Sequence, residues 1–229
     1  MLARLFIIFS ILSFAATPSI SQEMKDDMAG QSTKKTEDAL KIKKTDLVIG
    51  NKKAPVTIVE YASMSCTHCA AFHNNTFDEI NKKYIETGKV KFVFRDFPLD
   101  EPALRGAMMA RCAGKESVEN FLKFTKVMFS TQSNWAPKKN YLEILSNIGK
   151  LGGMKGEEFE ACIADTKLEN SILEGKFEAV NVLDVRSTPT FFINGIMHKG
   201  SRDLDYLSGV IDGLLGITDN SASEVKPAE

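Results

Sequence analysis

The residues best suited to chemistry in this chain are Cys66 and Cys69, which are separated only by Thr67 and His68. Two cysteines at this spacing can form a disulfide across the first turn of a helix and exchange it with other thiols. Exchange requires the thiolate, and only about 3% of a cysteine with an unperturbed pKa of about 8.5 is ionised at pH 7. A pair that works by exchange therefore needs surroundings that stabilise one sulfur as an anion.

The sequence around the pair predicts that Cys66 lies where a loop meets a helix. Residues 56–61 form a β-branched, mostly apolar run that is typical of a buried central strand. A helix is predicted from about residue 67 to about residue 86, and free N–H groups and the helix dipole stabilise an anion at its start. We therefore expect Cys66 to be the stabilised thiolate, His68 to add positive charge when protonated, and Cys69 to be less exposed.

Two other interpretations of the pair stay open at the level of sequence. The spacing is also half of a zinc site, and His73 lies four residues after Cys69 on the same predicted helical face. Cys66, Cys69 and His73 would supply three metal ligands, but no fourth is evident nearby, and we predict no metal site. The pair can also be a disulfide without a catalytic role.

The remaining pattern places this unit in a larger α/β fold. A second strand at 90–94 completes a strand–helix–strand unit with a parallel pair. The pattern from about 102 to 182 is helical, and the chain then returns to strands at 190–193 and 196–199 and ends with a helix at 204–215. The candidate helices of the middle block are 103–113, 118–129, 139–148, 156–165 and 168–183. We predict an α/β fold in which a helical domain is inserted between the two halves of the sheet.

A second motif, Ser187-Thr188-Pro189-Thr190-Phe191, opens the late strand. Proline is tolerated at the first residue of a strand because its missing N–H is least costly there. A proline can also follow a cis peptide bond, usually in a tight turn. From the residues alone, either isomer is compatible with this position.

Together these motifs resemble the DsbA family, which are bacterial periplasmic thiol–disulfide oxidoreductases of thioredoxin fold. The resemblance rests on Val59-Glu60-Tyr61, the dithiol motif at 66–69, the helical insertion, and the run Thr188-Pro189-Thr190-Phe191-Phe192-Ile193-Asn194-Gly195. It covers about residues 46–215. The order of the motifs is highly specific to the superfamily and less specific to one subfamily.

The resemblance implies roles for the residues of both motifs. Cys66 matches the nucleophilic cysteine, Cys69 the resolving cysteine, and His68 the histidine that favours the thiolate. Pro189 matches the cis-proline that packs beside the disulfide, and Thr188 matches its substrate-contacting neighbour. No cofactor is implied other than the redox-active disulfide itself.

Glu60 and Thr67 complete the predicted site. Glu60, six residues before Cys66, matches a buried acid near the resolving cysteine, and a carboxyl group inside an apolar strand is able to relay a proton. A solvated strand residue is the alternative interpretation of Glu60. Thr67 is a predicted substrate contact, but the best-known oxidases carry proline there and valine at the position of Thr188. Since threonine before the cis-proline also occurs in thioredoxin-like isomerases, the balance of oxidation against isomerisation stays open.

Cys112 and Cys162, the other two cysteines of the chain, both fall in predicted helices of the insertion. In an oxidising compartment, a bridge between them would close a loop of about 50 residues and stabilise the fold by about 4 kcal/mol in the chain-entropy model. We predict a structural disulfide, with two inert buried thiols as the alternative. A second disulfide in the insertion resembles an alphaproteobacterial branch of the family.

Composition and the N-terminal residues indicate an exported globular protein. The 229 residues are 43% hydrophobic and 26% charged, and a net charge of -1 provides no general attraction for nucleic acid. Arg4, an apolar run at 5–16 and the small-x-small motif Ser19-Ile20-Ser21 indicate a secretory signal peptide over 1–21. An uncleaved N-terminal anchor is the alternative.

The domain organisation follows from these patterns. We expect a flexible linker at 22–44, the first part of a thioredoxin domain at 45–101, a helical insertion at 102–182, the second part at 183–218, and a disordered tail at 219–229. The linker lacks the apolar repeat by which some related proteins assemble, and we expect a monomer.

The predicted function is donation of the Cys66–Cys69 disulfide to unfolded or partly folded exported proteins in the periplasm. The resemblance implies reoxidation by a membrane partner of the DsbB type. An isomerase or reductase similar to the ScsC proteins is the alternative within enzymes. A periplasmic metal carrier that uses Cys66, Cys69 and His73, and a chaperone that binds unfolded chains, are alternatives of other classes.

Overall fold

The computed structural model describes residues 33–115, 117–199 and 203–217 of the chain. The predicted signal peptide at 1–21 and the predicted tail at 219–229 lie outside these residues. Within the described residues, no helix is both long enough and apolar enough to cross a membrane.

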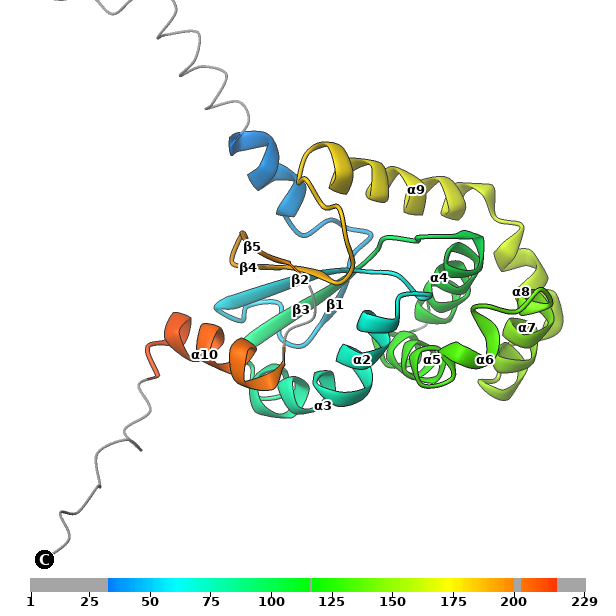
Figure 1. The fold of residues 1–229 in the computed structure, drawn as a ribbon, viewed down its shortest axis with the longest axis horizontal. Helices are drawn as coiled ribbons and strands as arrows, with labels where there is room; N and C mark the ends of the chain where they lie inside the picture. The colour runs from blue at the N-terminus through cyan, green and yellow to red at the C-terminus, as the bar shows by residue number, and fades with distance from the viewer. Residues whose placement is uncertain (1–32, 116, 200–202, 218–229) are drawn as a thin grey trace, which may run out of the picture.

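A mixed sheet of five strands in the order β1-β3-β2-β4-β5 forms the centre of the molecule (Figure 1). Its strands are β1 (Leu47–Ile49), β2 (Val56–Ala62), β3 (Val90–Asp96), β4 (Thr190–Ile193) and β5 (Ile196–Lys199). The central strands β2 and β3 are parallel, and the other pairs are antiparallel. The parallel pair and the late hairpin confirm the two halves of the sheet that the sequence predicted.

Successive side chains of each strand point to opposite faces of the sheet, and this divides the core into two layers. Ile58, Phe92 and Phe94 belong to the larger cluster, whereas Val59 and Val93 belong to the smaller one on the opposite face. In Figure 1, α10 (Leu204–Leu215), α2 (Thr67–Asn75) and α3 (Phe77–Ile80) lie on one side of the sheet, and α9 (Thr166–Asn181) lies on the other. Helices therefore cover both faces, as a thioredoxin-like fold requires.

The helical block between β3 and β4 confirms the predicted insertion. It contains α4 (Glu101–Gly114), α5 (Val118–Ser130), α6 (Gln132–Trp135), α7 (Tyr141–Leu151) and α8 (Gly156–Ile163), followed by α9. Side chains cap several of these helices, since Asp100, Ser117 and Asp165 accept hydrogen bonds from the backbone of α4, α5 and α9. The short α6 was not predicted, because four residues carry no periodic pattern.

The helix predicted over 67–86 is interrupted. It divides into α2, α3 and a π-helical turn, η1 (Asn81–Ile85). The break falls at Thr76, whose φ is -120°, directly after Asn74 and Asn75. Asparagine and threonine have poor helix propensity, which explains why the break falls at this point.

The prediction of a flexible linker over 22–44 is wrong for residues 33–40, which form a helix on the α9 side of the sheet. Ala39 is buried in the smaller core cluster, and the buried Arg95 donates from Nη1 to its carbonyl oxygen over 2.7 Å. Arg95 also pairs with Asp46 at 2.8 Å. These contacts are long-range and leave no signal in a polar segment, and strand β1 was missed because it has only three residues.

Candidate active site

Cys66 is the N-cap residue of α2 and holds the first turn of the helix. The Cys69 amide donates to Cys66 Sγ over 3.3 Å, and the Cys66 backbone is extended, with φ -78° and ψ 118°. Both cysteines are free thiols and both are buried, Cys66 at 7% exposure and Cys69 at 0%. The structure therefore represents the dithiol form, with the more accessible sulfur at the helix N-terminus as the sequence predicted.

The surroundings stabilise one sulfur as an anion and the other as a thiol. The pKa of Cys66 is lowered to about 5, chiefly by the hydrogen bond with the Cys69 thiol; burial opposes this shift, and Thr188 and the amides of Cys69 and His68 support it. Burial is the main cause that raises the pKa of Cys69, and the Cys66 sulfur and the charge of Glu60 add to it. The two thiols are thus suited to different steps of an exchange reaction.

The loop before β4 lies directly against the Cys66 sulfur. The peptide bond between Thr188 and Pro189 is cis, and Cys66 Sγ donates to the Thr188 carbonyl oxygen over 3.3 Å. The structure thereby brings together the two motifs that are 122 residues apart in sequence. Thr67 and His68, which follow Cys66 in the chain, are exposed. The His68 imidazole therefore lies on the surface, while its backbone amide hydrogen-bonds to the Cys66 sulfur.

Glu60 lies in the middle of β2 and is completely buried. Its Oε2 atom is 2.8 Å from Nε2 of His73, which is itself 7% exposed. Glu60 is therefore not a solvated strand residue. His73, which the sequence offered as a metal ligand, is bonded to this carboxyl group, and the described residues contain no group of three or more His, Cys, Asp or Glu side chains placed to hold a metal ion.

Gln132 of α6 is a site residue that sequence reasoning missed. Its buried amide Nε2 donates to the carbonyl oxygens of Met64 at 2.8 Å and Cys66 at 3.0 Å. The insertion therefore holds the loop that presents Cys66. No motif marks this glutamine, and its partners are more than sixty residues away in sequence, so no local signal was available.

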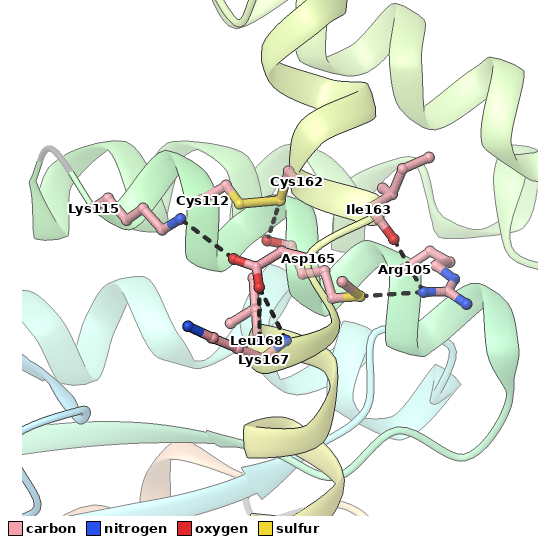
Figure 2. Close-up of a disulfide and its surroundings, with 9 residues drawn as sticks. Arg105, Cys112, Lys115, Cys162, Ile163, Asp165, Lys167 and Leu168 are labelled. Carbon is pink, nitrogen blue, oxygen red and sulfur yellow. Dashed lines mark hydrogen bonds and ion pairs between the residues drawn. A yellow bond between two sulfur atoms is a disulfide. The ribbon is translucent and has the colours of Figure 1, made fainter.

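Cys112 and Cys162 form a disulfide within the insertion, between α4 and α8 (Figure 2). Cys162 Sγ lies 3.1 Å from the Met108 carbonyl oxygen. Figure 2 also shows Lys115 approaching Asp165, which caps α9 just after the bridge. The bond joins α4 to α8 within the helical insertion, whereas Cys66 and Cys69 lie at the start of α2.

The comparisons with known proteins agree with this geometry. A family model described as Thioredoxin matches residues 42–213. A Rickettsia felis protein, named as a candidate protein-disulfide oxidoreductase, is 33% identical over 199 residues, which cover 87% of this chain and 70% of that protein. The crystal structure of Wolbachia pipientis alpha-DsbA1 matches with a TM-score of 0.75 at 36% identity, over 79% of this chain and 96% of that one. Disulfide bond formation protein D of Bacillus subtilis is 26% identical over 72% of this chain and 75% of its own length.

Fold, site and relatives define a thioredoxin-like thiol–disulfide oxidoreductase with a helical insertion. Within that class, the chain belongs to the DsbA family. Its enzymatic activity is exchange between thiols and disulfides on protein substrates.

Proposed function

We propose that this protein oxidises exported proteins in the periplasm by donating its Cys66–Cys69 disulfide to them. The observation that carries the proposal is the asymmetry of the two thiols, with the pKa of Cys66 lowered to about 5 and that of Cys69 raised. A stable Cys66 thiolate favours the reduced form of the enzyme, which makes its disulfide a strong oxidant.

The reaction begins when a client thiolate attacks Cys66 Sγ. The Cys66–Cys69 bond breaks, Cys69 leaves and takes up a proton, and a mixed disulfide joins the client to Cys66. A second client thiolate then attacks the client sulfur of this bond, and Cys66 leaves as the stabilised thiolate. The client loses two electrons and gains a disulfide, while the enzyme becomes the dithiol.

The other site residues have supporting roles in this proposal. The Thr188 carbonyl oxygen lies against Cys66 Sγ and Pro189 follows it directly, so these two residues would align the client chain, with the exposed Thr67 and His68 beside its path. Glu60 would exchange the proton of Cys69, since it is buried and its charge already acts on that thiol. The protein would be exported by a cleaved signal peptide over 1–21, act as a monomer, and be reoxidised by a membrane partner of the DsbB type.

A redox equilibrium with glutathione tests the proposal. A potential near -120 mV means an oxidase, and one near about -270 mV means a reductant. Zinc and copper analysis of the reduced protein provides an independent test, because near-stoichiometric metal would favour a carrier instead.

A disulfide isomerase is the second candidate, and Thr188 beside the cis-proline favours it. Refolding of a scrambled substrate separates the two activities. An oxidase restores such a substrate slowly unless a reductant is supplied, whereas efficient restoration without added oxidant would contradict the oxidase proposal.

A further inference from the structure

The buried pair of Glu60 and His73 has a geometry that the proposed reaction does not yet explain. A carboxyl group at 0% exposure needs hydrogen-bond partners in place of water. Glu60 has one such partner among the described residues, His73 Nε2 on its Oε2 atom, and its Oε1 atom has none there. One oxygen of the carboxyl group is thus committed, and the other is available for a proton.

The position of His73 is fixed from two directions. It lies one helical turn after Cys69 on α2, so both side chains project from the same buried face of the helix. Its ring stacks on Phe129 of α5 with centroids 4.5 Å apart and an interplanar angle of 12°. Phe77 and Phe94 enclose the same ring. The insertion therefore helps to set the orientation of the imidazole.

The charged groups near this pair are few. Glu60 is the partner contributed by β2, and Cys69 is the titratable group on the same face of α2. Asp96 lies two residues after Phe94 and therefore on the same face of the sheet, but Arg111 of α4 is bonded to it at 2.6 Å. The aromatic contacts from α3, β3 and α5 carry no charge.

We propose that His73 is a positioning residue that donates its Nε2–H to Oε2 of Glu60 and so leaves Oε1 to take the proton of Cys69 when the disulfide closes. The inference rests on the proposed role of Glu60 as the proton acceptor. It assigns a proton to Nε2 of His73, so that the imidazole is the donor and Oε2 of Glu60 the acceptor of their hydrogen bond.

In this proposal, any oxidant that carries a disulfide can reoxidise the Cys66–Cys69 dithiol. The Cys66 thiolate attacks one sulfur of the oxidant, the other oxidant sulfur leaves as a thiolate, and a mixed disulfide forms on Cys66. Cys69 then gives its proton to Oε1 of Glu60 and attacks Cys66 Sγ. The Cys66–Cys69 bond forms, the second oxidant sulfur leaves as a thiolate, and two electrons have passed from the enzyme to the oxidant.

Rapid mixing of the reduced enzyme with oxidised glutathione tests the inference. Acid quenching and mass spectrometry resolve the reduced, mixed-disulfide and closed forms between about pH 5 and pH 9, so attack by Cys66 and closure by Cys69 are measured separately. H73F keeps a ring that can stack on Phe129 but removes the N–H donor, whereas H73Q keeps a donor at the reach of Nε2. E60Q removes the proton acceptor itself.

We expect closure in H73F to slow by about tenfold or more, with attack by Cys66 unchanged, and closure in H73Q to stay within about threefold of the wild-type rate. Closure at the wild-type rate in H73F, or an equal loss in H73F and H73Q, would overturn the role of His73. If E60Q also closes at the wild-type rate, the proposed role of Glu60 fails as well. Slow closure in E60Q together with normal closure in H73F refutes only the inference.

Nitrogen-15 NMR of the histidine-labelled wild-type protein keeps the inference testable if a variant does not fold. We expect a protonated Nε2 on His73 in the reduced enzyme between about pH 6 and pH 8. An unprotonated Nε2 that accepts a hydrogen bond from the Glu60 carboxyl group would overturn the proposal.

Discussion

The lowered pKa of Cys66 has a consequence for the stability of the reduced protein. A group whose pKa is lower in the folded state stabilises the fold above its unfolded pKa, and this contribution is lost as pH falls through the folded pKa. With a folded pKa of about 5 and an unfolded pKa of about 8.5, the contribution is about 0.4 kcal/mol at pH 5 and about 3 kcal/mol at pH 7. Cys66 is only 7% exposed, so solvent screening removes little of it.

The perturbation that isolates this effect is Cys66→Ser, because serine does not ionise in this range. Urea unfolding of the reduced proteins at pH 5 and at pH 7 gives, for each protein, the increase in unfolding free energy between the two pH values. We expect the wild type to gain about 2 kcal/mol more than Cys66→Ser between these pH values. The comparison stops at pH 7 because the raised pKa of Cys69 acts in the opposite direction above about pH 8.5.

Subtracting the Cys66→Ser gain cancels the contribution of the other titrating groups. This expectation is refuted if the two proteins gain the same free energy within about 0.5 kcal/mol, because the folded state would then not prefer the thiolate. It is also refuted if the variant gains more than the wild type, since that result would require a raised pKa for Cys66.

Three further variants test other parts of the structure. Gln132→Ala removes two hydrogen bonds to the carbonyl oxygens of the loop that presents Cys66. We expect it to lower the unfolding free energy by about 2 kcal/mol in urea and to slow thiol–disulfide exchange in an insulin-reduction assay. If neither value changes, Gln132 does not hold this loop. Replacing Cys112 and Cys162 together by alanine opens a bridge with a sequence separation of 50 and is expected to cost about 2–5 kcal/mol in thermal or urea unfolding, with the pKa of the catalytic thiol unaltered. Gly106→Ala places a Cβ 2.5 Å from the terminal methyl group of Met128, which must move, and 3.2 Å from the Trp135 ring, so we expect urea unfolding to show a loss of about 1 kcal/mol once the helix-propensity gain of alanine is included, and a stabilised variant would show that both neighbours relax freely.

Local patterns predicted the elements that carry the dithiol. Cys66 at the start of a helix follows from the strand before it and the periodicity after it, and Asn194-Gly195 fixed the late hairpin because both residues adopt positive φ in the structure, 45° and 86°. The cis bond before Pro189 could be inferred only by resemblance, since the residues alone allowed either isomer.

Long-range contacts of side chains could not be predicted in the same way. Gln132 reaches the active-site loop from an element of four residues, and nothing in its neighbourhood indicates a catalytic setting. His73 has the spacing of a metal ligand from Cys69, but its bond to Glu60 depends on how α2 packs over β2. Spacing identified the residue as chemically important, and only the packing shows which partner it has.

Ultraviolet absorbance at the thiolate band, followed from about pH 3 to pH 9 in the reduced protein, shows directly whether Cys66 is held as a thiolate. We expect a single ionisation near pH 5 that disappears in Cys66→Ser, with no ionisation of Cys69 in this range. A thiol that ionises near about pH 8.5, like free cysteine, would contradict it.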